Sequence, residues 1–189
     1  PDAIKAATNR LNGLNATVAH SNYSNFEDVL NNLNIDKIDG MLLDLGVSSY
    51  QLDNAERGFS FHNEAPLDMR MSKSGISAED IVNTFSENEL SDIFFRFGEE
   101  KFSRKIAERI VSERQKARIT TTTQLAEIIA SAYPSAARRD GHPARKCFQA
   151  IRIAVNAELD RLNEAMDVAF NMLNKDGVLE GRQHHTLDM

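Results

Sequence analysis

The stretch MLLDLGVSSYQLD, residues Met41–Asp53, begins as an apolar run and ends in a polar turn. A strand that only packs in a core needs no carboxylate at its end, so Asp44 is unexpected there. In doubly wound α/β sheets, ligands bind beyond the carboxyl ends of the strands. The following Gly46 permits a close backbone approach or an unusual dihedral angle. The interpretation that Asp44 only caps the turn stays open.

Several side chains just after Asp44 offer further hydrogen bonds. They are Ser48, Ser49, Gln51 and Asp53. Their concentration within a few residues of the strand end favours a binding site over a simple cap.

The sequence around this run alternates between helical and strand patterns. Residues 3–14 and 25–34 have helical spacing, and residues 16–20 read as a short strand. Residues 38–46 resemble a strand that is apolar on both faces, as in a parallel sheet. This alternation predicts an α/β fold.

From residue 77 onward the pattern is helical. Ser77 and Ser86 are each followed three residues later by an acid, which predicts two capping boxes and helices over 78–85 and 87–97. Residues 100–117 form an amphipathic pattern, and threonines 120–123 should cap a helix over 124–131. A long helix is expected from about 144 to 174, after which a turn at 174–177 should begin a strand.

Composition sets limits on the class of protein. The chain has 189 residues with 41% hydrophobic and 26% charged, which fits one globular domain or one domain carrying an insert. No stretch approaches the roughly 18 apolar residues of a membrane span. The single cysteine, Cys147, excludes a disulfide framework and favours a reducing, cytoplasmic location. The net charge of −6 means that any nucleic-acid contact must depend on local patches.

A second unusual stretch is ERGFSFHNEAPLDMRM, residues 56–71. Long irregular segments in compact chains are often functional. One interpretation is a loop held by its aromatic residues, with an internal ion pair between Arg57 and Asp68. The other is a cover over a bound ligand.

A third stretch, ARRDGHPARKCFQAIR at residues 137–152, concentrates positive charge in an acidic chain. Such a patch can hold phosphates, although basic runs are often only solvated faces. The basic run at 101–118 is less informative, because Glu100, Glu108 and Glu113 balance it. His184 and His185 have no acid-and-histidine spacing that indicates a metal site, so we expect none.

Five segments together resemble one known family. DLGVSSYQLD, ERGFSF, PLDMRM, FGEEKFSRKIA and FQAIRIAVNAEL are similar to the ribosomal RNA small-subunit methyltransferase H family, in matching order over about residues 1–179. The resemblance implies S-adenosylmethionine-dependent methylation of the exocyclic amine (N4) of a cytidine in small-subunit ribosomal RNA. It also implies a class I methyltransferase sheet of the Rossmann-like kind, with an inserted all-helical domain.

The resemblance assigns expected roles to individual residues. Tyr23, Asp44 and Gln51 would bind S-adenosylmethionine, and Asp44 is also the catalytic candidate. The RNA-binding candidates are basic side chains from the second and third stretches: Arg57, Arg70, Arg138, Arg139, Arg145, Lys146 and Arg152. The partner would be small-subunit ribosomal RNA or the assembling subunit, without a membrane, and the oligomeric state, including a dimer, stays open.

The same resemblance sets the expected domains. Residues 1–71 would be a partial methyltransferase domain, residues 72–143 the helical insert, and residues 144–189 a long helix returning to the sheet with an altered end. The family's glycine-rich cofactor loop and its first two strands would precede Pro1, so we expect a fragment with an incomplete sheet. Residues 180–183 are too polar for a buried central strand.

Two other functions are considered. A non-catalytic helical module that binds RNA or protein is the main alternative for a chain without the cofactor loop. A hydrolase using Asp44 and a serine would need a partnered histidine, which the sequence does not place.

Overall fold

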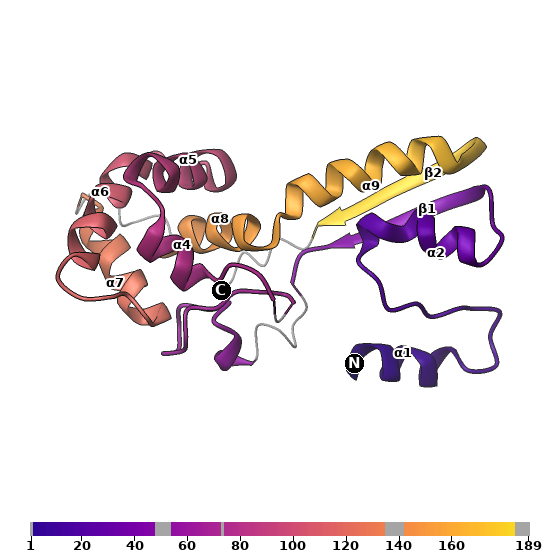
Figure 1. Cartoon of the computed structure of the whole chain (residues 1–189), viewed down its shortest axis with the longest axis horizontal. Helices are drawn as coiled ribbons and strands as arrows, with labels where there is room; N and C mark the ends of the chain where they lie inside the picture. Colours follow the sequence, from indigo (N-terminus) through magenta and orange to yellow (C-terminus); the bar gives the residue numbers. More distant parts are fainter. Residues whose placement is uncertain (1, 48–53, 73, 135–141, 184–189) are drawn as a thin grey trace. The chain divides into compact units, whose positions relative to one another are not determined.

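The computed structural model describes residues 2–47, 54–72, 74–134 and 142–183. Its elements are α1 (Asp2–Leu11), η1 (Tyr23–Asn25), α2 (Phe26–Asn32), β1 (Ile38–Leu45), η2 (Ala55–Arg57), α4 (Ala78–Thr84), α5 (Glu87–Gly98), α6 (Ser103–Arg114), α7 (Thr122–Ala132), α8 (Ala144–Asn156), α9 (Glu158–Met172) and β2 (Leu173–Gln183) (Figure 1). The chain divides into two compact units, residues 1–44 with 159–182 and residues 45–158 with 183–189. Within the described ranges, no helix is both long and apolar enough to cross a membrane.

The first unit contains the sheet, in which β1 and β2 pair side by side and run in the same direction (Figure 1). Side chains tie its parts together: Lys37 Nζ donates to the Asn171 carbonyl at 2.6 Å, and Asn174 Nδ2 donates to Asp39 Oδ1 at 2.7 Å. The mixed α/β class expected from the sequence is confirmed in this coarse form.

Two strand predictions need correction. Residues 16–20 form no regular structure, because a strand needs a neighbour for its N–H and C=O groups and only β1 and β2 pair among the described residues. The 38–46 strand exists as β1, but Leu43 alone in it is buried. Leu42 is 58% exposed, so β1 is not covered on both faces as the sequence pattern predicted.

The second unit is helical and holds a continuous hydrophobic core. Its fully buried side chains come from every helix between α4 and α8, among them Ile81, Phe94, Ile106, Ile129 and Phe148. Gly98 ends α5 where that helix meets α8, and a Cβ there would lie 2.7 Å from the Lys146 carbonyl oxygen. Only glycine allows this close approach.

The helix starts follow the predicted capping pattern. Ser77 and Ser86 each accept a backbone N–H from an acid three residues later, Asp80 and Glu89, whose carboxylates bond back to the serine N–H. Thr121 and Gln124 make the same reciprocal arrangement at α7. These three caps are therefore confirmed.

The predicted long helix over 144–174 is wrong. The chain leaves α8 at Ala157, which has a left-handed φ of 47°, and resumes as α9 at Glu158. The strand β2 begins at Leu173, before the predicted turn, and residues 180–182 at its end are exposed.

Candidate binding site

Asp44 lies at the carboxyl end of β1 with its side chain exposed. The flanking Leu43 and Val47 are buried, with 5% and 6% of their surface accessible. Gly46 has a φ of 115°, which confirms the unusual dihedral expected at this turn. Within the strand, Leu43 is therefore the buried side chain and the neighbouring Asp44 side chain is exposed.

Tyr23 begins η1 in the same unit and is half-buried. The preceding Asn22 positions it by accepting the Ser24 N–H at 3.1 Å, an N-terminal cap. Gln51, with Ser48, Ser49 and Asp53, lies outside the described residues. Their expected roles stay predictions.

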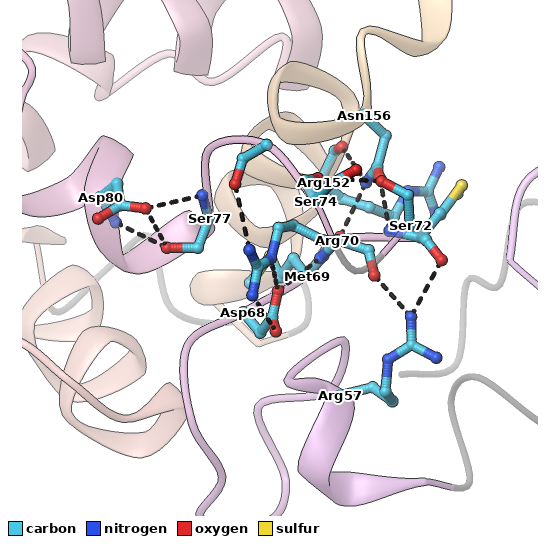
Figure 2. Close-up of polar contacts among 12 residues, drawn as sticks. Arg57, Asp68, Met69, Arg70, Ser72, Ser74, Ser77, Asp80, Arg152 and Asn156 are labelled. Atoms are coloured by element: carbon cyan, nitrogen blue, oxygen red, sulfur yellow. Dashed lines mark hydrogen bonds and ion pairs between the residues drawn. The ribbon is translucent and has the colours of Figure 1, made fainter.

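Residues 54–72 and 74–77, which we call the connecting segment, are held in the second unit by an array of polar contacts (Figure 2). Arg57 Nη2 donates to the carbonyls of Arg70 at 2.6 Å and Met71 at 3.2 Å, and its guanidinium lies 5.7 Å from the centre of the Phe59 ring. Gly58 follows with a φ of 68°, and a Cβ there would lie 2.2 Å from the Pro66 oxygen. Arg57 therefore fixes the fold of this segment.

Asp68 pairs with Arg70, not with Arg57 as one interpretation of the sequence expected. Asp68 Oδ1 accepts Arg70 Nε at 2.6 Å, and Oδ2 accepts Nη2 at 3.0 Å. Hydrogen bonds from the Arg70 guanidinium lower the pKa of Asp68 below its ordinary value, against the opposing effect of partial burial. The remaining Arg70 Nη1 donates to the Gly75 carbonyl at 3.1 Å, so this guanidinium closes the turn (Figure 2).

Asn156 of α8 holds the backbone of the same segment through its amide group. Its Nδ2 donates to the Met69 carbonyl at 2.8 Å and to the Arg152 carbonyl at 2.9 Å, while its Oδ1 accepts the Met71 N–H at 2.7 Å (Figure 2). Asn156 is buried, so these groups satisfy its whole amide away from water.

The other end of the segment docks on the start of α7. Thr122 Oγ1 donates to the Asn63 carbonyl at 2.7 Å and accepts the Ala65 N–H at 3.1 Å. The Leu67 N–H donates to the Thr120 carbonyl at 3.0 Å. Two helices therefore fix this irregular stretch, in addition to its own ion pair.

The basic residues of α8 have different surroundings. Arg152 is buried and bonds Glu158 through Nε at 2.9 Å and Nη2 at 3.2 Å. Lys146 is exposed and its Nζ donates to the Glu99 carbonyl at 3.2 Å, at the end of α5. Arg145 is half-buried beside it, and Arg138 and Arg139 lie outside the described residues. Contacts of these residues with RNA stay predictions.

His142 links the start of α8 to the connecting segment. Its ring stacks on Phe61 with centroids 4.4 Å apart, and its Nδ1 accepts the Ala144 N–H at 3.2 Å. Burial lowers the pKa of His142, and nearby His62 acts in the same direction. The Nδ1 atom therefore serves as a hydrogen-bond acceptor at the start of α8.

Comparison of the sequence with known proteins shows which family the chain belongs to. Residues 1–188 match the MraW methylase family. The chain belongs to that family. The "Ribosomal RNA small subunit methyltransferase H" of Clostridium botulinum (strain Loch Maree / Type A3) is 52% identical over 188 residues, which cover 98% of this chain and 61% of that protein.

Two further relatives agree with this membership of the MraW methylase family. "Ribosomal RNA small subunit methyltransferase H 2" of Agathobacter rectalis is 49% identical over 99% of this chain and 61% of its own length. The "Ribosomal RNA small subunit methyltransferase H" of Deinococcus deserti is 49% identical over 92% of this chain and 58% of its own length. The chain therefore spans about three fifths of the length of these relatives.

Within this MraW family chain, the sequence interpretation missed Asn156 and Thr122 as the residues that hold the connecting segment. A signal for Asn156 was present: it lies two turns after buried Phe148, on the apolar face of α8. A polar residue on such a face needs hydrogen-bond partners in the core. For Thr122 the sequence predicts only a helix cap, because its partners Asn63 and Ala65 are far away in the sequence.

Proposed function

We propose that this chain is part of an enzyme that transfers a methyl group from S-adenosylmethionine to the N4 amine of a cytidine in small-subunit ribosomal RNA. Membership of the MraW methylase family is the observation that carries the proposal. The names of the similar relatives supply the ribosomal RNA substrate. The location would be cytoplasmic, and the partner would be this RNA or the assembling subunit.

The residues present fit part of a cofactor site by the chemistry of their donors and acceptors. The Asp44 carboxylate is exposed at the carboxyl end of a strand in a parallel pair, where ligands of α/β sheets bind. A carboxylate accepts hydrogen bonds from hydroxyl or amine groups, and the Tyr23 ring offers an aromatic face. Asp44, Tyr23 and Gln51 would hold the cofactor in this proposal.

Bound S-adenosylmethionine would supply a methyl group already activated on a positively charged sulfur. The protein then mainly has to align donor and acceptor and exclude water. The amine of cytosine is a weak nucleophile, because its lone pair is delocalised into the ring. A hydrogen bond from this amine to Asp44, or to main-chain carbonyls near Ser48 and Ser49, would increase its nucleophilicity. The cytidine would have to leave its stack or already be unpaired.

The domain organisation proposed with this function is a class I methyltransferase sheet interrupted by an all-helical insert. Residues 1–71 and 144–189 would belong to the methyltransferase part, and residues 72–143 to the insert. Support comes from the purely helical α4–α7 region that follows the connecting segment.

Calorimetric titration of the 189-residue chain with S-adenosylmethionine tests the proposal. We expect submillimolar binding that Asp44→Asn weakens by about 10-fold or more, since a hydrogen bond to a charged group contributes about 1.5–3 kcal/mol. Asp36→Asn is the matched control, because Asp36 is an exposed acid just before β1. If the two variants bound S-adenosylmethionine with equal affinity, Asp44 would not be part of the cofactor site.

A non-catalytic RNA-binding module is the second candidate. The observation behind it is that the continuous hydrophobic core lies within residues 47–151 of the helical unit. Absence of heat with S-adenosylmethionine, together with retained RNA binding, would favour this module and overturn the enzymatic proposal for the chain.

A further inference from the structure

A groove in the helical unit lies apart from the residues that either proposal uses. It runs between α5 and the start of α6 and has a volume of about 590 Å³. Its walls carry Ser91, Asp92, Phe95, Lys101, Arg104 and Lys105. At its base the Ser91 and Ser103 hydroxyls are 3.3 Å apart and hydrogen-bonded, which joins the two helices. The volume is within the range of small-ligand pockets, about 300–1,000 Å³.

Phe95 gives the groove an exposed aromatic wall. Its neighbour Phe94 is fully buried, whereas Phe95 is 64% exposed. Phe95 therefore adds little to the hydrophobic core, and its ring is available to a flat partner. Aromatic rings of this kind stack with nucleic-acid bases, which contributes about 1–3 kcal/mol per base.

Three basic side chains also line the groove. Lys101, Arg104 and Lys105 are exposed, and none makes a side-chain hydrogen bond or ion pair within the part of the chain that the structure describes. Phe102 at the N-cap position of α6 makes no side-chain cap, and no acid occupies the first turn of this helix. The Glu100 carboxylate accepts the Phe102 N–H at 2.8 Å.

In the sequence, Glu100, Glu108 and Glu113 balance the basic run at 101–118. In the structure, these acids do not neutralise the basic residues of the groove. Glu100 is only 2% exposed, and it accepts hydrogen bonds from the Tyr133 hydroxyl and from the Phe102 N–H. Glu113 bonds Lys116 at 2.9 Å and Arg109 at 3.3 Å, further along α6. Among the described residues that line the groove, Asp92 is the acid, and Glu108 is not one of them.

We propose that this groove binds a single-stranded segment of RNA, with a base stacked on Phe95 and phosphates beside Lys101, Arg104 and Lys105. The choice of RNA rests on the proposed function. The groove itself favours RNA over an acidic peptide, because its aromatic wall suits a base and Asp92 would repel a purely anionic chain. Asp92 can instead accept a hydrogen bond from a base amine or a ribose hydroxyl.

The test is a fluorescence-anisotropy titration of the 189-residue chain with a short labelled single-stranded RNA at several salt concentrations. The triple variant Lys101→Gln, Arg104→Gln, Lys105→Gln should weaken binding. Its salt slope should fall by about 2, because each neutralised phosphate contributes about 0.7 for single strands. Phe95→Ala should weaken binding by about 5- to 150-fold with an unchanged slope.

Matched controls separate the groove from general effects. Phe95→Leu keeps an apolar side chain without a ring and should bind as weakly as Phe95→Ala; wild-type affinity would overturn stacking. Lys5→Gln, Arg10→Gln, Lys175→Gln removes the same charge from exposed positions of the first unit. An equal fall in slope with this control would overturn the groove as the site.

Two further outcomes would also overturn the inference. One is the absence of RNA binding by the wild-type chain, and the other is equally tight, Phe95-dependent binding of a short polyglutamate peptide. Calorimetry with S-adenosylmethionine on the same variants keeps the two proposals distinguishable. If the Phe95 variant and the triple variant bound both S-adenosylmethionine and RNA as the wild type does, this inference would be wrong, whereas the proposed function would be unaffected.

Discussion

Asn156 holds the backbone of Met69 in a left-handed conformation. Met69 has a φ of 57° and is completely buried, and Asn156 Nδ2 bonds its carbonyl at 2.8 Å. A left-handed conformation costs a non-glycine residue about 1–2 kcal/mol. The structure accepts this cost because one amide bonds the backbone on both sides of Arg70, through Met69 and Met71.

We therefore expect Asn156→Ala to lower the free energy of unfolding by about 3 kcal/mol, since it leaves buried backbone groups unpaired. Asn171→Ala is the matched control. Asn171 makes the same bond to the carbonyl four residues earlier, at 3.0 Å, but is exposed, so its loss should cost about 0.5 kcal/mol or less. Urea denaturation followed by circular dichroism measures both free energies of unfolding. Equal losses of stability in the two variants would contradict the proposed role of Asn156 in holding the connecting segment.

Two glycines of the connecting segment allow the cost of backbone strain to be distinguished from the cost of a steric clash. Gly58 and Gly75 both have left-handed φ values, of 68° and 92°. At Gly75 a Cβ would meet nothing within 4 Å, whereas at Gly58 it would lie 2.2 Å from the Pro66 oxygen and 2.9 Å from the Asp68 nitrogen.

Gly75→Ala should therefore cost only the conformational strain, about 1–2 kcal/mol. Gly58→Ala adds a backbone clash that no side chain can relieve, and should cost about 4 kcal/mol or more. Thermal unfolding of the two variants in parallel measures the difference. If Gly58→Ala were no less stable than Gly75→Ala, the result would contradict the close contact between Gly58 and the Pro66 carbonyl.

The Asp68–Arg70 pair should make stability depend on pH in the acid range. Because hydrogen bonds from Arg70 lower the pKa of Asp68, the folded state binds a proton less readily than the unfolded chain. The stabilisation is then complete above the unfolded pKa of about 3.9 and is lost as pH falls through the lower, folded value.

Asp68→Asn should cost about 1–2 kcal/mol at pH 7. Its stability should approach that of the wild type as pH falls through the lowered, folded-state pKa of Asp68. Asp92→Asn, which removes the same charge from an exposed position, is the matched control. Urea denaturation repeated across this pH range measures both differences, and a constant difference for Asp68→Asn would contradict the pairing.

The features that the sequence could predict are local ones. Ser77 with Asp80 and Ser86 with Glu89 are three residues apart, so their capping boxes depend on no distant partner. Gly46 follows a strand end, and its left-handed φ also reflects the local turn. Side-chain period and capping chemistry alone determine such elements.

The features that could not be predicted depend on partners distant in the sequence. Asp68 pairs with Arg70 and not with Arg57, because Arg57 bonds the carbonyls of Arg70 and Met71, which are distant from it in the sequence. Residues 16–20 have a strand-like sequence but no neighbouring strand among the described residues. The break at Ala157 interrupts a pattern that is helical on both sides, and the Arg152–Glu158 pair lies directly across it.

That pair gives a prediction about the joint between α8 and α9. The Arg152 side chain is 8% exposed and that of Glu158 is 18% exposed, so removing one partner leaves the other charge poorly solvated. Glu158→Gln should cost about 3 kcal/mol. Glu113→Gln breaks an ion pair with Arg109 and Lys116 at the surface and should cost about 0.5 kcal/mol.

Replacing both partners tests whether Arg152 acts within the fold or on RNA. The double variant Arg152→Met, Glu158→Leu removes both charges of this pair and should recover part of the stability lost in Glu158→Gln. Since the Arg152 guanidinium is buried on Glu158, we also expect this variant to bind single-stranded RNA as the wild type does. Urea denaturation and anisotropy titration measure the two properties separately. Restored stability with weakened RNA binding would instead support the RNA contact predicted for Arg152 from the sequence.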